Sequence, residues 1–455
     1  MNPFMKSAIE RVKTLAAVPY ARAVGDFQHI SEDDFWAYQK ERFGYIYRDA
    51  VQCIPYYIGR EHDYPKGLDE QGGILDVLAQ LPVLPKSAVK QDVNQFWRHP
   101  PLFLTREHTT GGTTGTPLRV RASLMERGYT EAILRQRYRE IVGTPTPRIL
   151  RLSGFLEKGT NDSMFLRIPG TKFAYLSIYE LRVQRAGEVR RILADFKPNV
   201  LHGYASALHQ LALLFGDQPV QSEQKWVVVS TSETLFDHQR VDIERNLNAI
   251  VLNEYGSQEG QHLVLECTEG SLHIHPGRGV VEILKPNEDV PAESGELGRV
   301  VVTGLVNRTM PLIRYDLGDS AISTGYAADC KCGLQWPTIG SVFGRTEDLV
   351  RTRDGRRIGI LSHSTLKDWE GIAESQIIQE GFERFRYLIV PQNPTSFDAV
   401  GLEAHVREQL RNRIGGDAEV MFDYVDAVPR TAAGKIQAVM LHPDFRESLR
   451  ARGEL

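Results

Sequence analysis

The sequence predicts an α/β fold: a large N-terminal domain with mixed sheets and a β-rich subdomain, followed by a small, mobile α+β C-terminal domain. Helical and strand-like segments alternate between residues 124 and 230, which is typical of a parallel sheet covered by helices. After about residue 270, short strands separated by Gly, Pro and Asn dominate. A further unit of about 100 residues, the size of a small domain, follows residue 348.

The N-terminal part, up to residue 100, is expected to be mainly helical. Apolar residues recur at helical spacing from Ser7 to Ala17. A second helix over residues 31–53 begins at Ser31 and carries acidic residues in its first turn, where they complement the helix dipole. Periodicity and β-branched runs then place the remaining elements along the chain. We expect helices over 124–141, 188–196, 205–215, 362–370 and 403–413, and strands over 149–154, 226–230, 272–274, 279–283, 299–303, 375–391 and 419–425.

Composition excludes several classes of protein. With 54 Lys and Arg against 58 Asp and Glu, the formal net charge is −4, which argues against a nucleic-acid-binding protein and against disorder. No apolar stretch approaches the roughly 20 residues that span a bilayer, and Glu10 interrupts the N-terminal segment. We therefore expect a cytoplasmic protein without membrane association. Four cysteines are too few for a disulfide scaffold in a chain of 455 residues.

The strongest local pattern is the segment Thr109–Pro117, with the sequence TTGGTTGTP. Its glycines let the backbone approach a ligand closely, and its hydroxyl and amide groups can bind phosphate oxygens. The Gly-Lys-Ser/Thr ending of a Walker A loop is missing. A Thr/Gly-rich surface turn explains the segment equally well when it is taken alone.

Three further patterns are weak individually. Glu259 closes the segment YGSQE after an apolar run, and a carboxylate there could bind Mg²⁺. Asp319 ends the segment MPLIRYDLGD and could accept hydrogen bonds from ribose hydroxyls. Lys435 ends the loop PRTAAGK. In isolation these residues are a solvated loop carboxylate, an Asp-containing turn and an exposed loop cation.

The order and spacing of these patterns, together with GRTED at residues 344–348, resemble the motif series of the adenylate-forming superfamily. Within it the chain resembles the phenylacetate-CoA ligase branch in its length, in the M-P-L-I-R-Y-x-x-x-D form, in the C-x-C-G stretch from Cys330 to Gly333, and in LHGYASAL from Leu201 to Leu208. The resemblance covers roughly residues 75–440. It implies an ATP- and acid-binding adenylation domain over residues 1–346 and a lid domain with the catalytic lysine over residues 347–455.

The resemblance also implies roles for individual residues. Lys435 would reach the carboxylate and the α-phosphate, Glu259 would bind Mg²⁺, and Glu347, where the family usually has Asp, would be the hinge. Thr114 would act on the phosphates during catalysis. Tyr255 would stack near the adenine, and Glu233, in the segment STSETL, would contribute a further contact on the adenine side. The implied nucleotide-binding set is Thr110, Gly111, Gly112, Thr113, Thr114, Gly115, Glu233, Tyr255, Gly256, Ser257, Asp319 and Arg345.

The implied reaction is ATP-dependent: an acid and ATP form an acyl- or aryl-adenylate and pyrophosphate, and the acyl group then passes to a thiol, most simply coenzyme A. A carboxylate is a poor nucleophile towards an anionic phosphate, so Mg²⁺ and a lysine must neutralise charge. Leu118 and Ala438 occupy positions where the superfamily often has cations. They keep open a carrier-protein thiol or an amine as acceptor, and a non-catalytic nucleotide-binding homologue is a further alternative. Asp316, where Arg or Lys is more usual, has no explanation from sequence.

The cysteines suggest a separate site. Cys267 is followed by His273, and Cys330 and Cys332 come from a second turn, which together predict a Cys₃His structural zinc site. His275 competes with His273 as the fourth ligand, and unrelated buried thiols are the alternative.

The identity of the acid does not follow from the sequence. We expect its pocket around Tyr204 and the segment 229–257, where His108 and His202 could line it or could serve as structural histidines. Aryl-acetic, benzoate-like, fatty and sugar-linked acids remain open, as does a homodimer.

Overall fold

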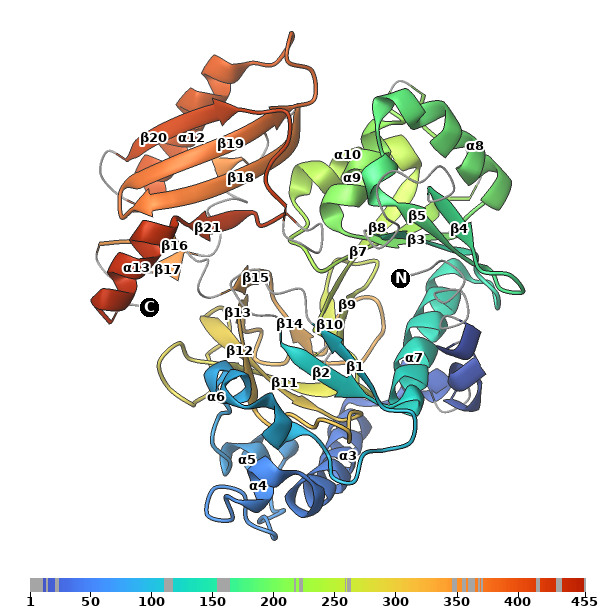
Figure 1. Cartoon of the computed structure of the whole chain (residues 1–455), viewed down its shortest axis with the longest axis vertical. Coiled ribbons are helices and arrows are strands. Elements are labelled where there is room, and N and C mark those ends of the chain that lie inside the picture. Colours follow the sequence, from blue (N-terminus) through green and yellow to red (C-terminus); the bar gives the residue numbers. More distant parts are fainter. Residues whose placement is uncertain are drawn as a thin grey trace.

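The computed structural model contains three main sheets, which Figure 1 shows as separate layers. It describes residues 11–13, 15–20, 24–109, 118–153, 164–216, 218–220, 224–257, 259, 263–345, 350–353, 357–358, 365–366, 369, 371–414, 418–430 and 436–453. Among these residues, no helix is both long enough and apolar enough to span a membrane.

The first sheet has nine strands in the order β14-β10-β9-β8-β7-β6-β3-β5-β4, and its central strands β5, β3, β6, β7 and β8 are parallel. This parallel centre confirms the α/β expectation. Its strands are β3 (Ile149–Ser153), β4 (Phe165–Arg167), β5 (Phe173–Ser177), β6 (Val200–Gly203), β7 (Trp226–Thr231), β8 (Ala249–Gly256), β9 (Leu263–Glu266), β10 (Leu272–Ile274) and β14 (Thr338–Ile339).

Helices cover both faces of this sheet. Helices α8 (Ala186–Phe196), α9 (Ala205–Leu213) and α10 (Asp237–Leu247) pack on one face through a buried apolar cluster. Helix α7 (Leu124–Val142) packs on the other face, where Tyr138 joins the apolar strand residues. The sequence sets the ends of α7 locally: Ser123 and Glu126 form a reciprocal capping box, and Gly143 ends the helix at φ 69°.

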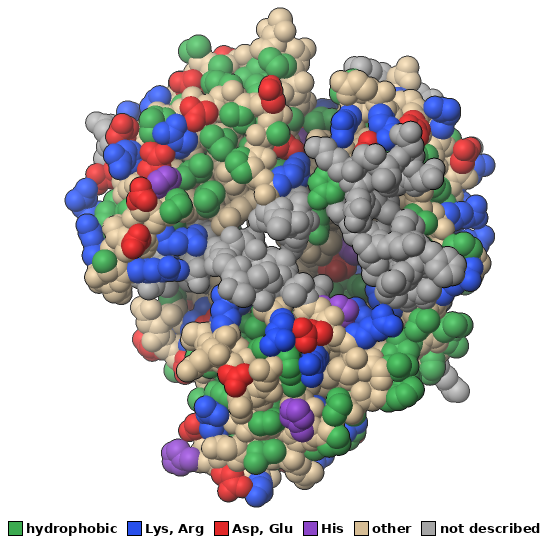
Figure 2. Space-filling model, viewed as in Figure 1, with side chains coloured by type: hydrophobic (Ala, Val, Ile, Leu, Met, Phe, Trp, Pro, Cys, Tyr) green, Lys and Arg blue, Asp and Glu red, His purple; other side chains and the backbone are tan. Residues whose placement is uncertain are grey.

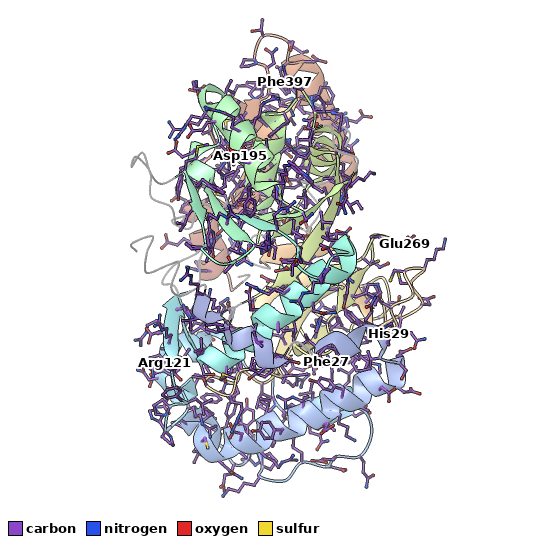
Figure 3. All side chains as sticks on the ribbon, turned by 90° about the vertical axis from the view of Figure 1, so that its right-hand side faces the viewer. Phe27, His29, Arg121, Asp195, Glu269 and Phe397 are labelled. Carbon is purple, nitrogen blue, oxygen red and sulfur yellow. The ribbon has the colours of Figure 1, made fainter. Side chains whose placement is uncertain are left out.

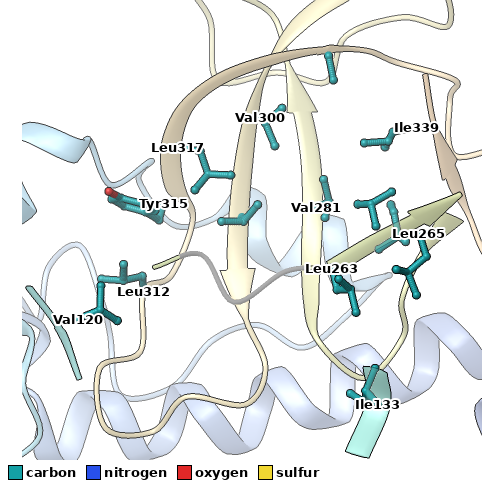
Figure 4. Close-up of a cluster of buried hydrophobic side chains, with 14 of the residues drawn as sticks. Val120, Ile133, Leu263, Leu265, Val281, Val300, Leu312, Tyr315, Leu317 and Ile339 are labelled. Carbon is teal, nitrogen blue, oxygen red and sulfur yellow. The ribbon is translucent and has the colours of Figure 1, made fainter. Parts of the chain in front are cut away.

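The second sheet is antiparallel, with strands β11 (Gly279–Leu284), β12 (Leu297–Gly304), β13 (Tyr315–Ile322) and β15 (Val342–Arg345). Its apolar core extends to Leu263 and Leu265 of the first sheet and to Ile133 of α7, as Figure 4 shows. The hairpin of β1 (Arg106–Thr109) and β2 (Arg119–Ala122) flanks residues 110–117.

The N-terminal helices pack below the second sheet in Figure 1. The expected helix over residues 31–53 is confirmed as α3 (Glu32–Cys53), and the Ser31 side chain accepts the Asp34 N–H at 3.1 Å. The shorter helices are α4 (Pro55–Ile58), α5 (Ile74–Ala79) and α6 (Lys86–Gln91). Single 3₁₀ turns lie at η1 (Val18–Tyr20), η2 (Asp26–His29), η3 (Val93–Phe96), η4 (Ile178–Glu180) and η5 (Val183–Arg185).

The C-terminal unit has its own sheet, in the order β20-β19-β18-β21, and its own apolar core. The strands are β18 (Ile372–Gly381), β19 (Arg384–Pro391), β20 (Glu419–Tyr424) and β21 (Val439–Leu441), and a two-stranded ribbon is formed by β16 (Val350–Arg351) and β17 (Arg357–Ile358). The helices are α12 (Ala399–Ile414) and α13 (Pro443–Ala451). The strands expected near residues 375–391 are β18 and β19, whereas the sequence pattern began α12 four residues late and missed β21 and α13.

The C-terminal unit lies beside α8–α10. In the side view of Figure 3, Asp195 of α8 and Phe397 near the start of α12 lie at one end of the molecule, and Phe27 and Arg121 lie at the other. Figure 2 shows that the surface is hollowed between the C-terminal unit and the two N-terminal sheets. The expected boundary at residues 346 and 347 and most of the expected helix over residues 362–370 fall outside the described residues.

Candidate active site

Two residues of the predicted nucleotide site meet across the two N-terminal sheets. The Tyr255 hydroxyl, on β8, donates to a carboxylate oxygen of Asp319, on β13, at 3.0 Å. Asp319 also lies opposite Arg345 in the register of β13 and β15. The structure thus brings Tyr255, Asp319 and the backbone of Arg345 together, although they are distant in sequence. Gly256 ends β8 and Ser257 follows it directly.

Glu259 is buried, with 5% of its surface exposed, and its partner was not predicted. The Lys86 ammonium, at the start of α6, lies 3.2 Å from Glu259 Oε1 and donates to the Leu317 carbonyl at 3.3 Å. Lys86 therefore balances the charge of the carboxylate that we expected to bind Mg²⁺. Nothing in the local sequence marked Lys86, because 173 residues separate the two side chains.

Glu233 connects the N-terminal domain to the loop of the predicted catalytic lysine. Its Oε2 accepts the backbone N–H of Ser206 at 2.9 Å, in the first turn of α9, and its Oε1 accepts the backbone N–H of Ile436 at 2.7 Å. Burial raises the pKa of the Glu233 carboxyl above its ordinary value, and the two backbone donors oppose that shift. Ile436 directly follows Lys435, so this carboxylate contacts the C-terminal end of the lysine loop.

The other end of that loop is held by Arg430. Its guanidinium donates to the Ser206 hydroxyl at 3.2 Å and is ion-paired with Glu374 of β18. Arg430 therefore contacts Ser206 of α9 directly, and Ile436 is linked to the same residue through Glu233. The segment itself, with Lys435, lies outside the described residues.

Two further contacts join α9 and α10 to the C-terminal sheet. His209, which is fully buried, lies with its Nδ1 3.1 Å from the carbonyl of Ala373 on β18 and its Nε2 2.8 Å from Asp242 Oδ2. The Gln392 amide donates to the same Asp242 oxygen at 2.9 Å.

The structure leaves several predicted residues without a geometric test. These are the phosphate loop (Thr110, Gly111, Gly112, Thr113, Thr114 and Gly115), the hinge residue Glu347 and the Arg345 side chain. All of them lie outside the described part of the molecule.

Asp316, which the sequence left unexplained, has a structural role. Its Oδ2 accepts from the Arg299 guanidinium at 2.9 Å and its Oδ1 accepts the Gly318 N–H at 2.8 Å. Gly318 has φ 72°, which favours glycine, so Asp316 stabilises the turn that presents Asp319.

The predicted Cys₃His group assembles as a compact cluster. The ligand atoms of Cys267, His273, Cys330 and Cys332 all lie within 4.8 Å of one another. The Cys267 and Cys330 sulfurs are 3.7 Å apart, close to the roughly 3.8 Å edge of a tetrahedron with Zn–S bonds of about 2.3 Å.

Of the two histidines, the structure brings His273 into this cluster. His273 Nε2 faces the Cys332 sulfur at 3.4 Å, and its Nδ1 lies 2.9 Å from the Trp336 carbonyl, which fixes the ring orientation. His275 instead accepts the Gly277 N–H and packs against Phe27 and Trp336.

Comparison with known proteins identifies one family model and several relatives that resemble this chain. Residues 350–441 match a family model described as the CapK C-terminal domain. Protein CapK of Staphylococcus aureus is 28% identical over 252 residues, and the match spans about half of each protein, 53% in both cases. Phenylacetate-coenzyme A ligase of Thermus thermophilus is 26% identical over 88% of this chain and 87% of that protein. The Escherichia coli enzyme of that name is 24% identical over 71% of this chain and 74% of that enzyme.

Solved structures share the fold. A crystal structure of 2-hydroxyisobutyryl-CoA ligase in the postadenylation state superposes with a TM-score of 0.66 at 15% identity, over 95% of this chain and 94% of that one. ATP-bound MatB from Rhodopseudomonas palustris gives a TM-score of 0.51 at 18% identity, over 76% of this chain and 68% of that one. Over most of its length the chain is thus a homologue of phenylacetate-CoA ligase and CapK, and it has the fold of the adenylate-forming CoA ligases.

Proposed function

We propose that the protein is an acid–thiol ligase that forms an acyl-adenylate from a carboxylic acid and ATP and then transfers the acyl group to coenzyme A. The observation that carries the proposal is the bond between Glu233 and the Ile436 N–H, at 2.7 Å. This bond brings Ile436, at the end of the lysine loop, to the edge of the parallel sheet where β7 and β8 end. The predicted nucleotide-binding residues Tyr255 and Asp319 lie on β8 and on β13. Ligands of open α/β sheets bind at this edge.

In the first step a carboxylate oxygen attacks the α-phosphorus of ATP and the bond to pyrophosphate breaks. Asp319 binds the ribose hydroxyls in this proposal, and Tyr255 orients Asp319 through its hydroxyl while its ring stacks near the adenine. Lys435 neutralises the approaching anions. In the second step the sulfur of coenzyme A attacks the acyl carbon and AMP leaves.

Glu259 is suited to a hard divalent cation, because a carboxylate oxygen is the type of ligand that Mg²⁺ prefers. Bound there with the nucleotide, Mg²⁺ would neutralise phosphate charge. Lys86 holds the carboxylate in position, since the ammonium lies 3.2 Å away.

We further propose that the Cys₃His cluster holds one structural zinc ion. Three sulfurs and one imidazole nitrogen at this spacing make a closed tetrahedral set, which leaves no position for a substrate. The site would join the turn after β9 to the segment before β14, and its role would be stability.

The two half-reactions need different positions of the lysine, and we propose that the C-terminal unit rotates about Glu347 between them. Arg430 and Glu233 would hold the C-terminal unit in the adenylation pose. Breaking their contacts would let the thiol of coenzyme A approach the acyl carbon. The experiment that tests the proposed function is acid-dependent ATP/pyrophosphate exchange, followed by assays with coenzyme A, a carrier-protein thiol and an amine as acceptors.

A further inference from the structure

The face of the parallel sheet under α7 changes from apolar to polar along the strands. Residues opposite one another in a parallel register share a face, so the sheet can be described as rows. The first row is entirely apolar and consists of Ile149, Phe173, Val200, Val227 and Ile250. The second consists of Arg151, Tyr175, His202, Val229 and Leu252, and the third, at the carboxyl ends, includes Ser177, Thr231 and Glu254.

The polar side chains of these rows form a cluster around Glu254. The Arg151 guanidinium donates to His202 Nδ1 at 2.9 Å, and the Thr231 hydroxyl donates to Glu254 Oε1 at 3.4 Å. Arg151 and Arg278 both lower the pKa of Glu254 electrostatically, against a larger rise from burial. The cluster is therefore a charged group enclosed between α7 and the sheet, and it lies where the acid pocket was expected.

Two atoms of the cluster face each other without a bond. His202 Nε2 and Glu254 Oε2 are 3.9 Å apart, and neither has a hydrogen-bond partner among the residues that the structure describes. His202 is buried and Glu254 is nearly so, with 8% and 11% of their side-chain surfaces exposed. Buried polar atoms are nearly always hydrogen-bonded in native proteins, so this pair calls for a third group.

The protonation state of His202 defines that group. Because Arg151 donates to Nδ1, the ring proton is on Nε2, and burial holds the pKa of His202 well below its ordinary value, so the ring is neutral. With Glu254 ionised, opposite Arg151 and Arg278, the pair offers one N–H donor and one carboxylate acceptor. An oxygen atom between them can lie about 2.8 Å from each. A hydroxyl fits, since it accepts one bond and donates the other, whereas a carbonyl cannot donate and an ammonium cannot accept.

We propose that the acid activated by this protein carries a hydroxyl group, which binds between His202 Nε2 and Glu254 Oε2. The inference rests on the proposed function for the location of the acid. It excludes apolar aryl-acetic and fatty acids as preferred substrates, because a methylene or ring edge would leave both buried polar atoms unpaired. His202 and Glu254 become specificity-determining residues, with Arg151 as the positioning residue of His202.

The test compares acids that differ by one or more hydroxyl groups: glycolate with acetate, lactate with propionate, mandelate with phenylacetate, and quinate with cyclohexanecarboxylate. ATP/pyrophosphate exchange gives kcat/KM for each member. A site that hydrogen-bonds a substrate hydroxyl rejects the analogue without it by on the order of 100-fold or more. We expect such a preference in at least one pair.

Variants assign the preference to the cluster. Glu254→Leu should reduce the ratio of kcat/KM for the hydroxylated acid to kcat/KM for the deoxy acid at least about tenfold. This is the scale of one lost charge-assisted hydrogen bond. Glu254→Gln, which keeps the side-chain volume, should reduce it less and covers the case in which the leucine variant does not fold. Glu244→Gln, on the exposed side of α10, is the matched control and should leave the ratio unchanged.

Each outcome decides the proposal. Equal or higher activity with the deoxy member in every active pair overturns it, because an ordered water would then satisfy the two atoms. If no acid in the panel supports exchange, the proposed function fails, and the same pairs are compared by thermal shift without ATP. A larger rise in Tm with a hydroxylated member than with its deoxy partner, which Glu254→Gln reduces, supports the hydroxyl site. No such difference overturns it as well.

Discussion

Glu233 offers the sharpest test of how the lysine loop is positioned. Its carboxylate accepts two backbone N–H groups, from Ser206 and Ile436, at 2.9 and 2.7 Å. A hydrogen bond to a charged group contributes about 1.5–3 kcal/mol, and the bond to Ile436 exists only when the loop is in this pose. Losing it in Glu233→Ala should therefore slow adenylation roughly 10- to 150-fold, since about 1.4 kcal/mol corresponds to a factor of ten.

The assay separates the two half-reactions. Adenylation is followed by ATP/pyrophosphate exchange, and acyl transfer is followed from supplied acyl-adenylate to coenzyme A. Acyl transfer should keep most of its rate in Glu233→Ala, because that step does not use the pose that Glu233 holds. Glu244→Ala on α10 is the control. Equal losses in both half-reactions would show that Glu233 supports the fold of α9 and would refute the positioning role.

The pH dependence gives a second readout of the same residue. Burial raises the pKa of Glu233, so its carboxylate is protonated at a higher pH than an exposed glutamate when the pH falls. Protonation removes one acceptor, and adenylation should then decline. Glu233→Gln should be slower near neutral pH and should lack this acid limb, and an unchanged acid limb in the variant would contradict the assignment.

Three further predictions concern other parts of the molecule. Purified protein should contain about one equivalent of zinc, and Cys267→Ser should lose it and melt at a lower temperature while Cys53→Ser keeps it, as measured by elemental analysis and calorimetry. Lys435→Ala should reduce adenylation at least ~100-fold and spare acyl transfer, whereas Glu347→Pro, which fixes φ at the hinge, should harm acyl transfer more than adenylation. Arg314→Met should lower the free energy of unfolding by about 3–5 kcal/mol in urea titrations, because it leaves the buried carboxylate of Glu282 unpaired.

The results that would contradict these predictions are distinct. A zinc content below about a tenth of an equivalent in unchelated protein would refute the proposed structural zinc site. Equal losses in both half-reactions for Lys435→Ala would make the lysine structural. For Arg314, the partner is Glu282 at 2.9 Å, and both are almost fully buried. The matched control is Arg353→Met, which removes an exposed ion pair and should leave the free energy of unfolding nearly unchanged.

Features with local causes could be predicted from the sequence. The acidic first turn after Ser31 marked the start of α3, and the helical periodicity located α7. The cysteines and His273 formed a recognisable ligand set because each residue type has specific chemistry. The motif order located Tyr255 and Asp319, and the structure brings their side chains into contact.

Features that depend on distant contacts could not be predicted. Lys86 pairs with Glu259 and Glu233 meets Ile436 over separations of 173 and 203 residues. The role of Arg314 in the MPLIRY motif is also tertiary, because it depends on Glu282 and on the Leu81 carbonyl. Strand β21 pairs in parallel with β18, and so short a strand has no signal of its own.

The most direct test of the proposed function is ATP/pyrophosphate exchange by the full chain with Mg²⁺ and a broad panel of carboxylic acids, both hydroxylated and apolar. The account predicts exchange that depends on the acid and that falls at least ~100-fold in Lys435→Ala. Tight ATP binding without exchange for any acid would contradict it and would favour a nucleotide-binding protein that acts without catalysis.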